Sequence, residues 1–268
     1  MAQDAADTSA GTRADHGVPA RLLGIWAHPD DEAYLAAGLM DRVVGSGGSV
    51  TTVTITDGEG GFGEDDPRSA DERAGLRRAE LGSAMAAIGV TDVRFLGVPD
   101  GSVAAAPVDG LVARLATVIE DVRPEVVVTF GPDGITGHPD HVATWRLASR
   151  AWLECGRGRL WCAAKTDAWL DEWRAMHDQL GVWMTEEPTG VRPEDVDLGL
   201  ELAGRALDRK RAVLAEHASQ TAGLVEAIGE ARYRRWIRSE TFRHPTRDEL
   251  VAVGGSRGAG GPSSASPA

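Results

Sequence analysis

The 268-residue chain is poor in cysteine, in aromatic residues and in positive charge. Its two cysteines, Cys155 and Cys162, are too few for a disulfide scaffold and lack the C-x-x-C spacing of a thiolate zinc site, so we expect a reducing, cytoplasmic location. With 28 Lys and Arg against 41 Asp and Glu, the net charge of −13 argues against nucleic acid or an anionic membrane as a partner. No run approaches the roughly 18 apolar residues of a membrane span, and residues 1–20 lack a signal-peptide pattern.

The two ends differ in composition from the rest of the chain. Residues 1–20 contain no apolar stretch, and residues 254–268 are Gly, Ser, Pro and Ala with a single charge, so we expect two disordered tails. Hydrophobic residues at 42% and charged residues at 26% are close to globular averages. The composition therefore predicts one folded domain over residues 21–253.

Short apolar segments alternate with helical patterns along this domain. Strand-like composition occurs at residues 21–27, 50–56, 93–96 and 125–130, and helices are expected over 33–44, 71–88, 111–122 and from 139. The alternation predicts an α/β, Rossmann-like fold with a doubly wound, mostly parallel sheet and helices on both faces. Polar clusters at 28–32, 57–61 and 131–141 follow three of the strands, so we expect them at one edge, where such sheets bind ligands.

Two of these clusters have the composition of a metal site: His28-Pro29-Asp30-Asp31 and His138-Pro139-Asp140-His141. Imidazole and carboxylate are ligands of hydrolytic zinc, which takes three protein ligands and leaves a fourth position for water. Each motif alone is also typical of a helix start, with Asp at the N-cap and Pro at the first position. Two copies at the ends of two strands favour the metal site. Because Asp30 and Asp31 are adjacent, their side chains cannot both point the same way. We therefore expect one to bind the metal and the other to act as a base on the bound water.

These motifs resemble those of the zinc-dependent N-deacetylases of the PIG-L/LmbE-like superfamily, which act mostly on N-acetylglucosaminyl compounds. The resemblance runs from about residue 21 to 243 and includes the segments 56–60, 77–89, 96–101, 210–220 and 240–242. It implies that His28, Asp31 and His141 bind one Zn²⁺ per chain, with another divalent metal as an alternative. It also implies that Asp30 is the general base and that His138 stabilises the oxyanion or acts as an acid.

Three further residues are candidates for substrate binding: Arg77, Glu59 and Asp57. The resemblance suggests that an Arg on the helix at 71–88 lies near the sugar, whereas the alternative for Arg77 is an i,i+3 ion pair with Glu80. Asp140 either orients a histidine by accepting a ring N–H or caps its helix. Seven acids between residues 57 and 72 favour a neutral or cationic amino-sugar conjugate over a sugar phosphate.

Three other patterns have more than one interpretation. Residues 58–63 match the nucleotide-binding pattern G-x-G-x-x-G, but the acids and Pro67 that follow oppose a phosphate-binding helix start. Six of the eight tryptophans fall within residues 145–183, where core packing is favoured over an aromatic wall for a sugar or apolar aglycone. His217, in a family-like segment with Ser219 and Gln220, is either a site residue or a structural histidine.

The sequence thus predicts a metal-dependent amide hydrolase that removes acetyl from an N-acetylglucosaminyl small molecule in natural-product or thiol and sugar-conjugate metabolism. One alternative is an amidase for a bulkier acyl group, as in the mycothiol-conjugate amidases. We expect Tyr before the second Gly-His in mycothiol-pathway relatives, and Thr136 at this place disfavours that branch. A non-catalytic sugar-binding module is disfavoured because the base position, Asp30, is intact.

Overall fold

The computed structural model of the chain describes residues 17–185 and 188–254. Most of the two expected tails lies outside the described residues. Residues 17–20 carry no helix or strand, and Gly254 is the last residue of a helix. Disorder of the tails therefore stays a prediction.

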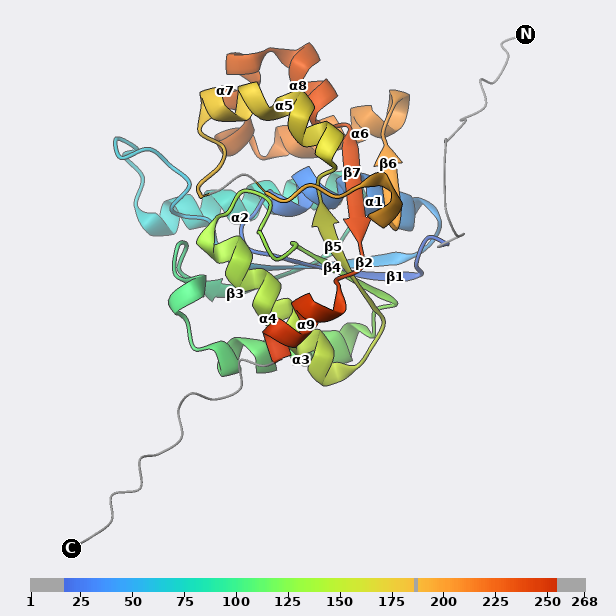
Figure 1. Cartoon of the computed structure of the whole chain (residues 1–268). Coiled ribbons are helices and arrows are strands. Elements are labelled where there is room, and N and C mark those ends of the chain that lie inside the picture. Colours follow the sequence, from blue (N-terminus) through green and yellow to red (C-terminus); the bar gives the residue numbers. More distant parts are fainter. Residues whose placement is uncertain (1–16, 186–187, 255–268) are drawn as a thin grey trace, which may run out of the picture.

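Seven strands form one sheet in the order β3-β2-β1-β4-β5-β7-β6 (Figure 1). The neighbours from β3 to β5 run parallel, whereas β7 is antiparallel to both β5 and β6. The strands are β1 (Arg21–Trp26), β2 (Ser49–Thr56), β3 (Asp92–Val98), β4 (Val126–Thr129), β5 (Arg159–Ala164), β6 (Leu198–Glu201) and β7 (Ser239–Arg243). The expected α/β fold with a mostly parallel sheet is confirmed.

The four strands expected from composition are all present, but β5, β6 and β7 were not predicted. Strand β6 has only four residues, and β7 reads Ser-Glu-Thr-Phe-Arg, which lacks an apolar run. Glu240 of β7 is nevertheless buried, because its carboxylate forms an ion pair with Lys210 at 2.7 Å. A buried polar residue of this kind removes the hydrophobic pattern by which a strand is recognised.

Helices cover both faces of the sheet (Figure 1). They are α1 (Asp31–Gly45), α2 (Ala70–Ala87), α3 (Val108–Val122), α4 (Pro139–Cys155), α5 (Asp167–Leu180), α6 (Gly204–Glu216), α7 (Ala218–Ile228), α8 (Glu230–Ile237) and α9 (Arg247–Gly254). On one side α1 and α2 pack against α6, and on the other α4 packs against α3 and α9. Within residues 17–185 and 188–254, every helix is too short or too polar to cross a bilayer.

The order of the strands determines where a site can form. Strand β1 lies between β2 and β4, so the chain leaves β1 toward one edge of the sheet and returns to β4 on the other side. In sheets of this type a crevice forms outside the carboxyl ends of the two strands at which the winding reverses. The loops after β1 and β4 carry the two His/Asp motifs, which are thereby brought together.

The tryptophan-rich segment packs inside the protein. Trp145 and Trp161 belong to the main core. Trp169 and Trp173 of α5 are buried in a second, smaller cluster with Leu170 and Met176. These positions support the core interpretation for four of the six tryptophans, whereas Trp152 and Trp183 are only partly buried.

His177 of α5 lies beside this second cluster, with its imidazole buried. Its Nε2 accepts a hydrogen bond from Trp236 Nε1 at 3.0 Å. Burial and the nearby positive charge of Lys165 lower the pKa of His177 to about 4. The folded protein therefore keeps this ring neutral at pH values where an unfolded chain protonates it.

We expect this histidine to make the protein sensitive to mild acid. Since an unfolded histidine has a pKa of about 6.5, stability contributed by the neutral ring is lost as the pH falls from about 6.5 toward about 4. Linkage gives a loss of about 2 kcal/mol between pH 7 and pH 5. His177→Gln, which does not titrate, should lose less over this interval in urea unfolding. Equal losses in both proteins would contradict the prediction.

Candidate metal centre

The first motif joins β1 to α1 through an unusual backbone conformation. Asp30 is the N-cap residue of α1 and has φ 129° and ψ −22°, although it is not glycine. Its side chain is turned toward Arg77, with Asp30 Oδ2 lying 3.4 Å from Arg77 Nη2. The Asp of this motif therefore occupies the cap position without using its carboxylate as a cap.

The second motif joins the loop after β4 to α4. His138 is the N-cap residue, and its Nδ1 accepts the backbone N–H of Asp140 at 3.0 Å. Pro139 takes the first helical position, as expected for a helix start. The cap is thus a histidine rather than the Asp that the sequence pattern suggested. The cap hydrogen bond fixes the ring at the start of the helix.

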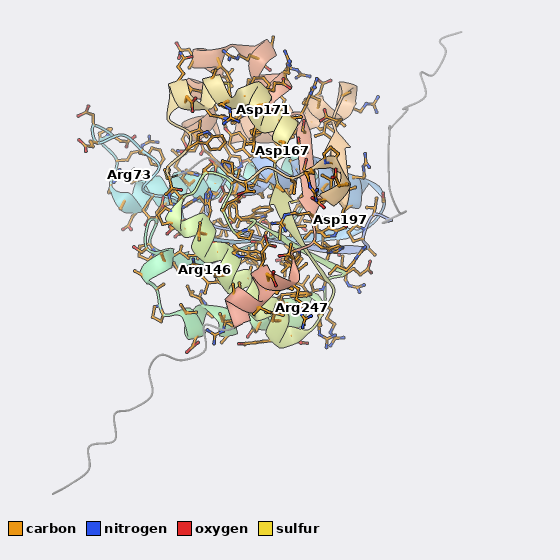
Figure 2. All side chains as sticks on the ribbon, viewed as in Figure 1. Arg73, Arg146, Asp167, Asp171, Asp197 and Arg247 are labelled. Atoms are coloured by element: carbon orange, nitrogen blue, oxygen red, sulfur yellow. The ribbon has the colours of Figure 1, made fainter. Side chains whose placement is uncertain are left out.

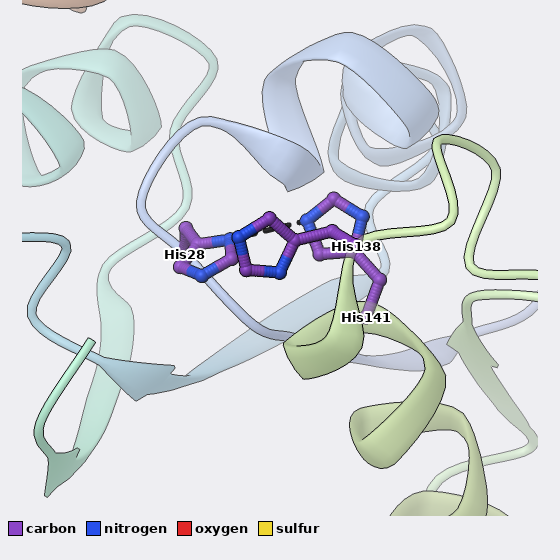
Figure 3. Close-up of side chains that lie close together, drawn as sticks. All are labelled: His28, His138 and His141. Carbon is purple, nitrogen blue, oxygen red and sulfur yellow. Dashed lines mark hydrogen bonds between the residues drawn. The ribbon is translucent and has the colours of Figure 1, made fainter. Parts of the chain in front are cut away.

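The histidines of the two motifs lie close together (Figure 3). Donor atoms of His28, His138 and His141 lie within 4.8 Å of one another, and His28 Nδ1 is 3.1 Å from His141 Nε2. Asp31 lies against the same two rings, with Oδ2 3.6 Å from His28 Nδ1 and Oδ1 3.3 Å from His141 Nε2. The three residues expected to bind metal are therefore brought together.

A hydrogen bond on the far side of the His141 ring and an ion-pair contact on the far side of the His28 ring indicate which ring nitrogens carry protons. His141 Nδ1 lies 2.9 Å from the carbonyl oxygen of Gly134, which can only accept, so its ring proton is on Nδ1. His28 Nε2 lies 3.1 Å from Asp100 Oδ1, which favours a proton on Nε2. When both rings are neutral, their two lone pairs and the Asp31 carboxylate converge on one point. This donor set fits a divalent metal ion.

Asp100 was not predicted as a site residue. It follows β3 at the same edge of the sheet, within the segment 96–101 that resembles the family. With His28 and Asp140 it forms a second group of donor atoms within 4.8 Å. Its other oxygen accepts the N–H of Gly60 at 3.0 Å, and both oxygens of Asp140 accept backbone N–H groups after β3. These engaged carboxylates are better suited to hold the His28 ring than to bind metal.

Asp140 faces the histidine of the other motif. Its Oδ2 lies 3.5 Å from His28 Nε2, while its two oxygens accept from the N–H groups of Gly101 and Val103. This arrangement supports the first of the two expected roles, orientation of a histidine. It also ties the loop after β3 to the start of α4.

The burial of so many ionisable groups shifts their pKa values. Burial raises the pKa of Asp30 to about 6, against the opposing effect of Arg77, and it raises the pKa of Asp31 to about 6, against that of His28. Burial and the neighbouring His28 lower the pKa of His141 to about 3. Burial also disfavours the charged form of His28, but Asp100 and Asp140 outweigh it and raise its pKa to about 10. The cluster thus favours positive charge next to these carboxylates, as a bound cation would supply.

The three residues expected to contact substrate have partners within the protein. Arg77 is only 3% exposed, and it donates to the carbonyl oxygens of Pro29 and of Gly58. Asp57 pairs with Arg78 at 2.6 Å. Glu59 accepts the N–H of Asp100 at 2.8 Å. The enclosed position of Arg77 favours a role in holding Asp30 over direct contact with a substrate.

The glycine-rich loop after β2 wraps around Arg77. A Cβ atom at Gly58 would lie 3.0 Å from Arg77 Cζ, and one at Gly61 would lie 2.5 Å from Arg77 Nη1. Gly58 also has φ +72°, which other residues rarely adopt. Gly58 of the nucleotide-binding pattern and its neighbour Gly61 are therefore required by the close approach of an arginine.

Known proteins share these features. The sequence profile of the PIG-L family, described as GlcNAc-PI de-N-acetylase, matches residues 23–152, which contain both His/Asp motifs. A 1D-myo-inositol 2-acetamido-2-deoxy-α-D-glucopyranoside deacetylase from Rhodococcus opacus (strain B4) is 34% identical over 238 residues, covering 75% of this chain and 81% of the relative. The chain belongs to the PIG-L family. The expected family resemblance is confirmed.

Solved structures show the same fold as this PIG-L family protein. The N,N'-diacetylchitobiose deacetylase from Pyrococcus horikoshii has a TM-score of 0.59 at 20% identity, covering 87% of this chain and 86% of that one. A deacetylase of the teicoplanin biosynthesis pathway has a TM-score of 0.60 at 17% identity, covering 85% and 99%. The fold is thus common to proteins that differ widely in sequence.

The contact between Asp100 and His28 yields a prediction for metal affinity. Asp100→Asn removes the charged acceptor of the His28 ring proton, and loss of such a partner weakens metal binding about 10- to 100-fold. Competition with a chelating dye measures the Kd for Zn²⁺. Asp92→Asn is the control, because Asp92 lies in β3, the strand that Asp100 follows, but pairs with Arg94 at 2.7 Å. Equal Kd values for Asp100→Asn and the wild type would contradict the assigned role.

Proposed function

We propose that this PIG-L family protein is a zinc-dependent N-deacetylase that hydrolyses the acetamide of an N-acetylglucosaminyl conjugate to a free amine and acetate. The observation that carries the proposal is the convergence of His28, Asp31 and His141 beside a carboxylate, Asp30, that is directed away from the helix cap. A bound zinc ion would polarise the acyl carbonyl and lower the pKa of a water molecule to about 7.

The surrounding side chains supply the proton transfers. Asp30 removes a proton from the attacking water, since a buried carboxylate with a raised pKa is a competent base near neutral pH. His138 Nδ1 is occupied as an acceptor of the Asp140 N–H, so the neutral ring carries its proton on Nε2. That N–H can donate to the developing oxyanion. Protonation of the leaving amine then falls to Asp30 rather than to His138.

The substrate class follows from the relatives and from the charges near the site. The name of the R. opacus relative specifies a 2-acetamido-glucopyranoside joined to inositol. In the loop after β2, Arg78 pairs with Asp57 and Arg68 with Asp66, and Arg73 extends from the start of α2 beside the same loop (Figure 2). The loop is therefore less acidic than its composition suggests. A neutral N-acetyl amino-sugar conjugate is the substrate we favour.

Two other features bear on this proposal. Thr136 Oγ1 lies 3.2 Å from His141 Nδ1, so this hydroxyl is turned to a ligand ring rather than toward an oxyanion. This position gives no support to the amidase alternative, which would require room and a donor for a bulkier acyl group. We also propose a cytoplasmic location, which the free thiols of the two cysteines support.

The proposal is tested with a panel of N-acylated amino sugars. N-acetylglucosaminyl inositol, diacetylchitobiose and their N-acyl homologues are incubated with the protein, and new primary amine is measured with a chelator, without metal and with Zn²⁺. We expect amine from acetyl substrates, loss of activity with the chelator and recovery with Zn²⁺. Release of bulkier acyl groups alone would indicate the amidase, and no amine at any metal condition would overturn the proposal.

Replacement of the proposed base separates chemistry from metal binding. Asp30→Asn should lower kcat about 10²- to 10⁴-fold, because general-base catalysis contributes a factor of this size. It should retain the zinc content of the wild type, measured by atomic absorption. Asp65→Asn, an exposed acid in the loop after β2, is the control and should leave kcat unchanged. Wild-type turnover by Asp30→Asn would show that another group acts as the base.

A further inference from the structure

Two buried ionisable side chains next to Asp30 have no part in the reaction steps above. Glu32 and His217 both have side chains that are 0% exposed, and Glu32 Oε1 lies 3.3 Å from His217 Nε2. The second oxygen, Glu32 Oε2, accepts the backbone N–H of Asp30 at 3.3 Å. Burial of an ion pair costs desolvation energy that the pairing often does not recover. The presence of such a pair beside a reactive group therefore indicates a role other than stabilising the fold.

The backbone of Asp30 is held from two sides. Its φ of 129° is a conformation that non-glycine residues adopt only where the surroundings impose it. The peptide between Pro29 and Asp30 is bound at both ends, since Arg77 donates to its carbonyl oxygen and Glu32 accepts from its N–H. The orientation of this peptide sets φ of Asp30. It therefore also sets the direction in which the Asp30 side chain leaves the backbone.

His217 is itself fixed by the junction between α6 and α7. Its carbonyl oxygen accepts the N–H groups of Gln220 at 2.9 Å and Thr221 at 3.0 Å. Ser219, two residues later, donates its N–H and its hydroxyl to Glu80 of α2, at 2.8 and 2.6 Å. Helix α2 also carries Arg77. The two groups that hold the Pro29–Asp30 peptide are thus connected through the rest of the fold.

We propose that Glu32 and His217 are positioning residues for Asp30. His217 holds the carboxylate of Glu32, and Glu32 fixes the Pro29–Asp30 peptide so that the Asp30 carboxylate points into the reaction site. The inference rests on the proposed function, in which Asp30 is the base, and extends it to residues beyond the metal and substrate contacts. It also assigns a role to the family-like segment that contains His217, Ser219 and Gln220.

The kinetic test compares variants that remove or retain the acceptor. Glu32→Ala and His217→Gln should lower kcat about 10- to 100-fold, because a displacement of about 1 Å at a reacting group has an effect of this size. KM and zinc content should stay close to wild type. Glu32→Gln keeps an oxygen that can accept the Asp30 N–H, so it should recover a large part of the lost kcat.

A control distinguishes positioning from loss of stability. Leu115→Ala, in the core on α3 and outside the site, should lower the Tm while leaving kcat unchanged at temperatures below unfolding. If Leu115→Ala loses as much kcat as Glu32→Ala at a matched decrease in Tm, the pair is merely structural and the inference is overturned. If Glu32→Ala fails to fold, His217→Gln is compared with Leu115→Ala in the same way, and Glu32→Gln serves as the variant that retains the acceptor.

A structural measurement tests the inference independently of turnover. Crystal structures of the wild type and of Glu32→Ala, or of His217→Gln if that variant fails to fold, give φ of Asp30 directly. We expect φ near +129° in the wild type and a different Asp30 backbone in the variant. An Asp30 backbone that is unchanged in the variant would overturn the proposal. If the wild type releases no amine from any substrate, the proposed function fails, while the backbone comparison still decides whether the pair positions Asp30.

Discussion

His28 Nδ1 and His141 Nε2 lie 3.1 Å apart, and the contacts of Asp100 and Gly134 on the opposite sides of the two rings keep these two nitrogens facing each other. Two lone pairs at this distance repel each other unless a proton or a cation lies between them. Asp31 adds a carboxylate to the same space. The surrounding groups, including Asp100 and Gly134, hold the rings in this arrangement. The arrangement therefore favours a positive charge between the rings, supplied by a proton on His28 or by a bound cation.

The sheet makes this contact possible between residues that are far apart in the chain. His28 follows β1 and His141 belongs to the first turn of α4, and β1 and β4 are hydrogen-bonded neighbours. The first motif lies where β1 passes into α1, and the second motif begins α4, so both are anchored in regular structure. Sites on such elements are held more precisely than sites on long loops. The late part of the chain, α6 and α7, closes the far side of Asp30 through His217 and Ser219.

Much of this arrangement could be predicted from the sequence. The β-branched segment 50–56 and the apolar segment 125–130 indicated strands, and two His-Pro-Asp motifs at strand ends indicated a common site. Strands β6 and β7 could not be predicted, because one is short and the other contains the buried Glu240. Periodicity and composition detect elements that bury apolar faces, and these two strands depend on tertiary contacts instead.

The sequence also could not predict which side chains pair with each other within the site. Arg77 and Glu80 have the spacing of a helix ion pair, yet Arg77 reaches Asp30 and Glu80 accepts from Ser219. Asp140 is adjacent to His141 in sequence but faces His28. In each case the partner comes from a distant segment that the fold brings near. The spacing of residues along a helix identifies only partners on the same helix, so it cannot reveal these long-range contacts.

The central claim is that His28, Asp31 and His141 form a metal centre. Anomalous diffraction at the zinc edge from crystals of the zinc-loaded protein tests it most directly. The account predicts one strong peak about 2.0–2.2 Å from His28 Nδ1, His141 Nε2 and an oxygen of Asp31. A peak between His28 Nε2, Asp100 and Asp140, or no peak in the crevice of fully loaded protein, would contradict it.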